Sequence, residues 1–512
     1  MAAAQAAPAD GQRTLITACV MLATVMQALD MTIANVALPY MQGSLSATQD
    51  QISWVLTSYI VSSAIAMPLT GFLTARFGRK KIFLTAVAGF TVASLLCGAA
   101  QTLEQMVLFR LLQGVFGAPL VPMSQSVLLD AYPREKHASA MALWGMGVMV
   151  GPILGPTLGG FLTENYNWRY VFYINLPVGV LAFIGLSAAL SESKLSRAPL
   201  DWTGFITLSL FIGALQMMLD RGEQLDWFSS LEIVTEAAIA ALAFYLFIVH
   251  TFTTKAPFVD PNMFRDRNFA VGVGFIFVVG MILFSTLALQ TPFLQNLMGY
   301  PVLQAGLIVA PRGLGTMTAM MLIGRLSGKV DPRIFLTFGL CLLAVALWET
   351  TGFTPDVDKG ALIRTGVLQG FGLGFLFVPL STIAFATLDP KYRVQGAALF
   401  SLIRNIGSSI GISIVIFLLA RSGQVMHAEL STHVTPFNQA LQHPEIQKYW
   451  NLGTTAGRMA LDGEVTRQAT IIAYANDYYV MMLLTLCCMP LVFLLRRPKS
   501  APGPGHSAAA ME

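Results

Sequence analysis

The chain has 512 residues, of which 55% are hydrophobic and only 11% are charged, and its net charge is +4. A soluble domain carries about 25% charged residues, so this chain cannot cover a water-facing surface and is expected to be embedded in lipid. The small net charge gives no indication of nucleic-acid binding.

Apolar runs of about 20 residues recur along the chain, and each is long enough to cross a bilayer as a helix. Open sheets are excluded, because unpaired backbone groups in hydrocarbon are costly. We therefore predict an all-α membrane protein with 14 spans. They lie at about 14–39, 51–74, 82–100, 105–128, 138–162, 170–190, 202–219, 231–252, 269–294, 303–325, 334–351, 361–386, 395–420 and 475–495.

Lys and Arg concentrate in alternate connecting segments, as in Arg76, Arg79, Lys80 and Lys81 after the second span. The positive-inside rule then places both termini in the cytoplasm. The first 13 residues and residues 496–512 are the predicted cytoplasmic tails.

The chain also repeats itself weakly. QGVFGAPLVPMS at 113–124 is echoed by QGFGLGFLFVPLS at 369–381. We predict an N-terminal six-helix half at 14–190, two inserted helices at 202–252, and a C-terminal six-helix half at 269–495. Two related halves around a central site are a plan typical of transporters.

Asp30 lies deep in the first span, where an ionised carboxylate is costly unless it finds a partner. Arg110, in the fourth span, is the natural partner at a comparable depth. Ionisable residues inside membranes often serve proton relays, so this pair is our candidate for proton coupling. The alternative is a static contact that only fixes helix packing. Asn35 and Gln113 are candidates to line a cavity nearby.

Two glycine-containing segments are candidates for helix packing and gating. Gly147, Gly151 and Gly155 recur every four residues in the fifth span, which permits close helix contact, while Pro152 and Pro156 permit bending. Plain tight packing is an equally good explanation. The second segment is GFLTARFGRKK, which contains Gly71, Arg76, Gly78 and Arg79. The alternative explanation is that its cations only set the orientation of the chain in the membrane.

Four segments of the chain resemble the motifs of a known family. LDMTIANVALP (29–39), LFRLLQG (108–114), GMGVMVGPILGPTLGG (145–160) and WRYVFYINLPVG (168–179) resemble motifs of the major facilitator superfamily, within it the 14-helix drug:proton antiporters of the EmrB and QacA type. The resemblance covers essentially the whole chain. It implies proton-driven efflux of hydrophobic or amphipathic toxic compounds from a bacterial inner membrane, with Arg110 in proton coupling.

Two positions depart from the family pattern. Ala75 stands where the loop motif usually has Asp, and Arg312 stands in a span where cation exporters of this type place an acid. If Arg312 and Arg404 face the cavity, its potential is positive and favours weak acids or anions. The alternative is that these arginines bind backbone carbonyls or cap helices.

The resemblance to EmrB-type exporters also implies partners: an EmrA-like periplasmic adaptor and an outer-membrane channel. The long polar segment 421–474 could contact the adaptor or cover the outer mouth as a lid. We expect no cofactor beyond the proton gradient, no metal site and no enzymatic activity. The closest competing hypothesis is a proton-linked importer or exporter of one specific metabolite on the same fold.

Overall fold

The computed structural model describes residues 10–133, 136–191, 200–326, 329–435 and 437–496, so most of both predicted tails lies outside the described residues. Within these residues, 13 helices are long and apolar enough to span a membrane. A bent pair covering 51–77 makes a fourteenth, with a bend of 55°. The prediction of an all-α protein with about 14 spans is therefore confirmed.

The N-terminal half consists of the first nine helices. They are α1 (Asp10–Ser44), α2 (Gln49–Ala66), α3 (Leu69–Phe77), α4 (Arg79–Ala99), α5 (Leu103–Gly117), α6 (Leu120–Ala131), α7 (His137–Asn165), α8 (Tyr170–Tyr173) and α9 (Asn175–Ala189). The second and fourth spans each break at a proline, Pro68 between α2 and α3 and Pro119 between α5 and α6. Proline lacks the N–H that would continue the helical ladder, which explains both breaks.

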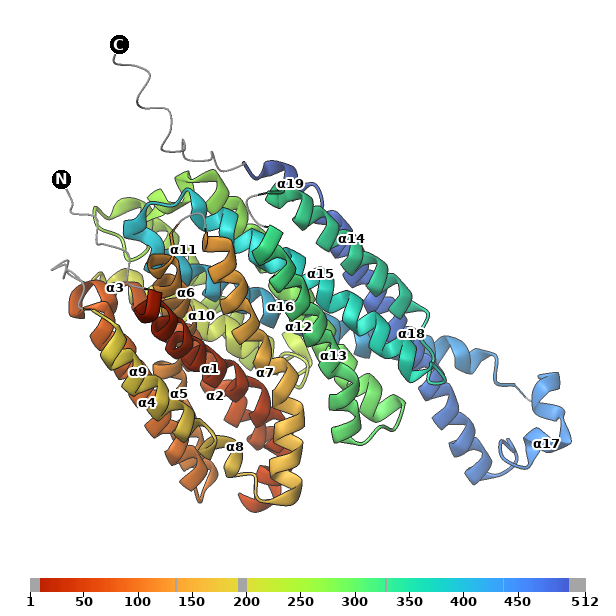
Figure 1. Ribbon diagram of the computed structural model, residues 1–512. Coiled ribbons are helices and arrows are strands. Elements are labelled where there is room, and N and C mark those ends of the chain that lie inside the picture. The colour runs from red at the N-terminus through yellow and green to blue at the C-terminus, as the bar shows by residue number, and fades with distance from the viewer. Residues whose placement is uncertain (1–9, 134–135, 192–199, 327–328, 436, 497–512) are drawn as a thin grey trace, which may run out of the picture.

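The C-terminal half consists of α12 (Arg267–Pro292), α13 (Val302–Leu326), α14 (Pro332–Thr351), α15 (Lys359–Ala386), α16 (Arg393–Thr432), α17 (Pro444–Gln447), α18 (Thr455–Cys487) and α19 (Leu491–Leu494). Helices α16 and α18 run well past the predicted spans. Much of the segment 421–474 is therefore helix that continues beyond the apolar core, with α17 at its far end (Figure 1). Thr454 caps α18, since its side chain accepts from the Gly457 N–H at 3.1 Å.

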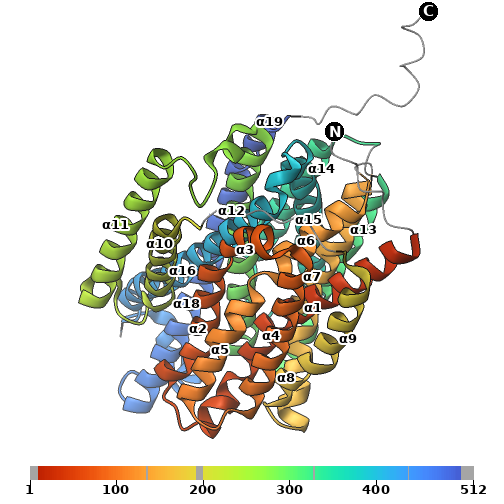
Figure 2. The same ribbon diagram turned by 90° about the vertical axis from the view of Figure 1, so that its left-hand side faces the viewer.

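Helices α10 (Trp202–Arg221) and α11 (Leu231–Thr253) form a pair at the edge of the molecule, with α11 outermost (Figure 2). Asp201 anchors the start of this pair, because its carboxylate accepts from the Gly204 N–H at 3.0 Å and from the Phe258 N–H at 2.9 Å. Burial raises the pKa of Asp201, but these bonds and the contact with His250 outweigh burial, and the pKa lies below its usual value.

Helix α10 hydrogen-bonds to both halves. The Gln216 Nε2 atom donates to Ser409 on α16 at 2.8 Å, and Ser413 on α16 donates to the Leu219 carbonyl at 2.5 Å. On the other side, Thr57 on α2 bonds to Asp220. The inserted pair is therefore attached to the N-terminal and the C-terminal half at once.

The bundle has two distinguishable ends in Figure 1. We call the end with α3 and α19 the terminal end and the end with α8 and α17 the loop end. Helix α7 of the first half packs along α13 of the second, and α16 packs against α3 and α6. Polar contacts between the halves lie near the terminal end, where Ser139 Oγ donates to the Gly324 carbonyl at 2.9 Å.

Candidate functional site

Asp30 lies on α1 with its side chain fully buried. Its Oδ2 atom accepts from Arg110 Nη1 at 2.8 Å. Its Oδ1 atom accepts from Gln113 Nε2 at 2.8 Å and from Asn175 Nδ2 at 3.0 Å. The carboxylate thus has a charged partner and two amide donors, so it does not depend on water for its hydrogen bonds.

The Arg110 guanidinium is equally enclosed. Its Nε atom donates to the Val55 carbonyl at 3.0 Å, and its centre lies 4.3 Å from the ring centroid of Tyr59. The Tyr59 hydroxyl in turn accepts from Gln27 at 3.3 Å. A buried ion pair is tolerated only when further hydrogen bonds satisfy both charges, and this arrangement meets that condition.

The local sequence explains how these groups meet. Arg110 and Gln113 are three residues apart on α5, which places them on one face of that helix. Asn175 opens α9, and it also donates to Ser94 of α4 at 3.0 Å. Asn175 and Ser94 were missed by the sequence analysis, although Asn175 lies inside the quoted motif WRYVFYINLPVG. The polar cluster therefore joins α1, α4, α5 and α9 inside the N-terminal half.

The predicted cavity residues do not share one place. Gln113 belongs to the Asp30 cluster and does not line a central cavity, contrary to its predicted position. Asn35 is exposed toward the loop end of α1, and Arg404 is partly buried on α16, where its Nη2 atom lies 3.5 Å from Asn405. The Arg404 guanidinium also lies 6.0 Å from the ring centroid of Phe377, whose ring stacks on Trp144 of the other half, so its place in a central cavity stays a prediction.

Arg312 does face the boundary between the halves. It is 4% exposed on α13, and its Nη2 atom donates to Thr286 at 2.6 Å. It borders a cavity of about 20 Å³ that Pro152 and Ile153 of α7 close from the other half. Such a volume holds about one water, so this state has no room for a drug-sized molecule beside Arg312. No carboxylate pairs with Arg312 among the residues that the structure describes.

The segment with Gly71, Arg76, Gly78 and Arg79 lies at the terminal end. Gly78 has φ of 92°, a conformation that favours glycine. A Cβ atom at Gly71 would lie 3.1 Å from Gln395 Cβ of α16, so the halves approach closely here. Arg76 lies over the ring of Phe72, 6.0 Å from its centroid.

Asp130 supplies an acid at this end, where Ala75 is exposed and carries no charge. Its two oxygens bind Arg79 at 2.7 Å and Arg393 of α16 at 2.6 Å. The second of these ion pairs crosses between the halves. Asp130 is not among the predicted site residues, because nothing in its local spacing distinguishes it from a surface acid at a helix end.

The glycines of α7 face α1. A Cβ at Gly151 would lie 2.2 Å from the Ala28 carbonyl oxygen, and one at Gly155 would lie 2.1 Å from Thr32 Oγ1. Gly147 similarly faces Met21, at 2.6 Å. Pro152 and Pro156 lie within the same helix. The glycine face therefore brings α7 against α1 at backbone distance.

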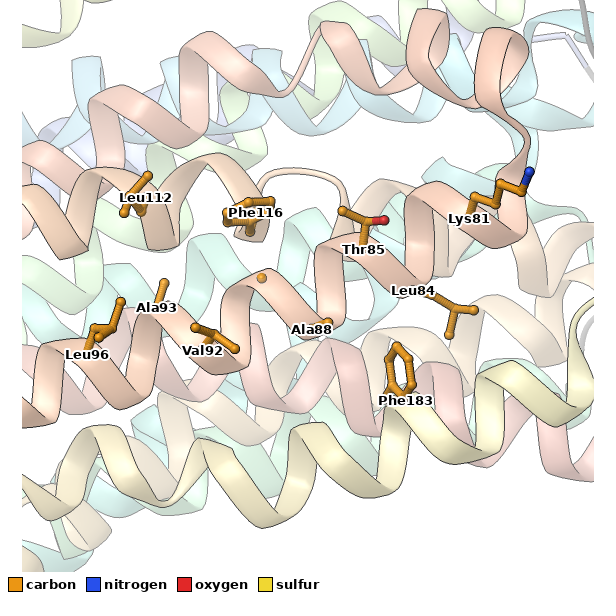
Figure 3. Close-up of a pocket in the computed structure, with 11 residues that line it drawn as sticks. Lys81, Leu84, Thr85, Ala88, Val92, Ala93, Leu96, Leu112, Phe116 and Phe183 are labelled. Carbon is orange, nitrogen blue, oxygen red and sulfur yellow. The ribbon is translucent and has the colours of Figure 1, made fainter.

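A larger pocket lies on the outside of the N-terminal half. Its volume is about 670 Å³, and it is formed by apolar side chains of α4, α5 and α9 with Lys81 at one end (Figure 3). Val92 and Phe183 on its walls are exposed on a surface rich in exposed apolar side chains. Because of these exposed apolar walls, we assign the pocket to the lipid-facing surface.

Comparison with known proteins shows similarity along almost the whole chain. A family model described as Major Facilitator Superfamily matches residues 20–412. The Escherichia coli K12 protein "Multidrug export protein EmrB" is 37% identical over 510 residues, covering 98% of this chain and 99% of that protein. "Fatty acid resistance protein FarB" of Neisseria gonorrhoeae is also 37% identical, covering 96% and 97%.

A solved structure shares the architecture. The human organic anion transporter MFSD10 superposes with a TM-score of 0.57 at 13% identity, covering 92% of this chain and 99% of that one. At this identity the similarity concerns the fold alone.

Proposed function

Because the chain belongs to the major facilitator superfamily, which consists of transporters and not enzymes, we propose that it is a proton-coupled exporter of hydrophobic or amphipathic toxic compounds. The observation that carries this proposal is the enclosed ion pair of Asp30 and Arg110, an ionisable pair in helices that span the membrane. Relatives that match almost the full length are named for export and resistance.

In this proposal, proton binding at Asp30 removes the negative charge of the cluster. A neutral Asp30 would no longer hold Arg110 by charge, so the contacts of α1 with α5 and α9 would weaken together. Two states of the half would then differ in proton affinity, and substrate and proton would compete by favouring different states. The halves would move as rigid bodies around the central site.

We further propose that the terminal end is cytoplasmic and that the membrane is the bacterial inner membrane. The concentration of Lys and Arg in the connections at that end supports this orientation. The contacts of Asp130 with Arg393 and of Ser139 with Gly324 would then close the cytoplasmic side in the state described here.

Arg312 suggests the substrate class. A buried cation that pairs with no carboxylate of the described residues makes the boundary between the halves positive, which favours weak acids and anions. Export of anilinonaphthalene sulfonate, a permanent anion, should exceed export of ethidium in the same vesicles. Equal or faster export of ethidium would contradict the anion preference.

The extension beyond the apolar core supports a proposed partner. Helices α16 and α18 project at the loop end, where an EmrA-like periplasmic adaptor and then an outer-membrane channel would engage them (Figure 1). Removing residues 437–451, which connect the two helices, should abolish adaptor pull-down. Unchanged pull-down would favour a lid over the outer mouth.

The central experiment uses proteoliposomes with an imposed pH gradient. The unaltered protein should drive anilinonaphthalene sulfonate against its gradient, and Asp30→Asn should abolish the response to pH while the protein remains in the membrane. Retained proton-linked export by Asp30→Asn would rule out Asp30 as the coupling group. Transport of one metabolite with no dye export would favour the competing metabolite carrier.

A further inference from the structure

A second buried acid lies in the C-terminal half. Asp477 is on α18 and is 1% exposed. Helix α18 packs against α14, α16 and α12. The neighbouring Asn476 donates to Ser422 of α16 at 3.0 Å, so this turn of α18 is fixed against α16 toward the loop end. Asp477 is not among the predicted site residues, because it lies at the outer edge of the predicted span 475–495.

Asp477 differs from Asp30 in its hydrogen bonds. Its Oδ2 atom is buried and has no hydrogen-bond partner, and within the described part of the chain no cation forms an ion pair with it. Asp30, in contrast, accepts from three donors. Glu236 also has a buried oxygen without a partner, but it lies on α11, outside both halves.

The ionisable groups around Asp477 do not compensate its charge. On α18 itself, Tyr474 and Tyr478 flank it, and Tyr478 lies within electrostatic reach of Arg312. Within the described residues, no charged group of the packing helices forms an ion pair with Asp477. Glu349 of α14 contacts Arg364, Arg267 of α12 donates to the Leu494 carbonyl, and Arg393 of α16 contacts Asp130. Arg404 of α16 lies beside Asn405, and the partly buried His427 of α16 contacts Asp462. The remaining groups are Arg333 at the start of α14 and the exposed Cys341, Arg421 and Glu429.

A carboxylate buried without a partner is unfavourable, whereas the neutral acid loses far less by burial. We propose that Asp477 is a second proton-binding site and that it carries a transported proton through the C-terminal half. This inference rests on the proposed proton-coupled export. The acid holds the proton in the state described here and releases it when the moving half brings water or the Arg312 guanidinium to the carboxylate.

The test separates proton movement from substrate movement. Proteoliposomes carry the full-length protein and the probe anilinonaphthalene sulfonate, with and without a pH gradient. Asp477→Asn should reduce accumulation driven by the gradient at least tenfold and leave probe exchange without a gradient within twofold. Asp477→Glu should restore part of the driven transport. Asp462→Asn is the matched control, because Asp462 is an exposed acid of the same helix that contacts His427.

Driven accumulation by Asp477→Asn at the unaltered level, with the same pH profile, would overturn the proposal. No response of the unaltered protein to the gradient would instead refute the proposed function itself.

A second measurement needs no variant. Dicyclohexylcarbodiimide modifies neutral carboxyl groups in apolar surroundings, and peptide mapping of the unaltered protein should place the adduct on Asp477, decreasing as pH rises. An adduct on Asp30 with none on Asp477 at any pH would also overturn the assignment.

Discussion

Asp30 and Arg110 are two buried charges that depend on each other. Arg110 donates to the Asp30 carboxylate and to Gln113. The side chains of Asp30 and Arg110 are both buried away from water. Removing one partner of such a pair leaves a buried charge uncompensated, which costs more than removing both. The energetic role of the pair can therefore be measured separately from its role in transport.

Arg110→Leu should lower the free energy of unfolding by about 3–5 kcal/mol, because Asp30 loses its only charged partner among the described residues. The double variant Asp30→Asn/Arg110→Leu should be more stable than Arg110→Leu alone. Thermal unfolding in detergent measures both. Arg364→Gln is the control, since its contact with Glu349 is exposed and is expected to contribute under about 1 kcal/mol. A double variant less stable than the single one would contradict this interpretation.

At the scale of elements, the contact between α1 and α7 depends on glycine. A side chain at Gly151 would collide with the backbone of α1, and backbone cannot move aside as a flexible side chain can. The same helix contains Gly160, where an added Cβ would meet nothing within 4 Å. The two positions form a matched pair for testing helix contact.

Gly151→Ala should destabilise the protein by about 1–3 kcal/mol through overpacking, seen as a lower thermal midpoint and slower transport. Gly160→Ala should leave both unchanged or raise stability slightly, because alanine is a better helix former. Equal behaviour of the two variants would show that the glycine face has no role in packing.

The inserted helix α10 is a second element with a testable role. Its Gln216 bonds to Ser409 of α16, while Asp220 bonds to Thr57 of α2. Gln216→Leu should cost about 0.5–1.5 kcal/mol by removing one hydrogen bond between the insertion and the C-terminal half. Thr207→Val is the control, because Thr207 bonds only within α10. A thermal midpoint unchanged by Gln216→Leu would show that this attachment does not stabilise the fold.

At the scale of the whole molecule, an ion pair and an aromatic contact join the two halves toward the terminal end. Asp130 contacts Arg393, and Trp144 of α7 stacks on Phe377 of α15 with ring centroids 5.5 Å apart. Contacts of this kind must open if the central site is to face both sides of the membrane in turn.

A disulfide between Ser139→Cys and Gly324→Cys, in a background without the native cysteines, should therefore stop transport. A Cβ at Gly324 would lie 3.7 Å from Ser139 Cα, close enough for a bridge. Dye export before and after reduction is the measurement, and reduction should restore it. Unchanged export by the fully bridged protein would show that this end stays closed throughout the cycle.

The sequence by itself determined the class of the molecule. A bilayer admits only helices or closed barrels, and the apolar runs are too long for barrel strands. Hydropathy therefore predicted the spans, and the depth of Asp30 and Arg110 in their runs identified them as partners. Breaks at Pro68 and Pro119, and the helical extensions of α16 and α18, were not foreseen, because apolar length does not reveal bends or polar helix.

Beyond the pair of Asp30 and Arg110, only the tertiary structure decided which polar residues meet. Gln113 and Asn175 donate to Asp30, and Asp130 contacts Arg393 across the halves. Among the described residues, the Oδ2 atom of Asp477 is buried without a hydrogen-bond partner. Spacing along a helix determines the face on which a residue lies. The neighbour of that face depends on how distant helices pack together, which no single stretch of sequence contains.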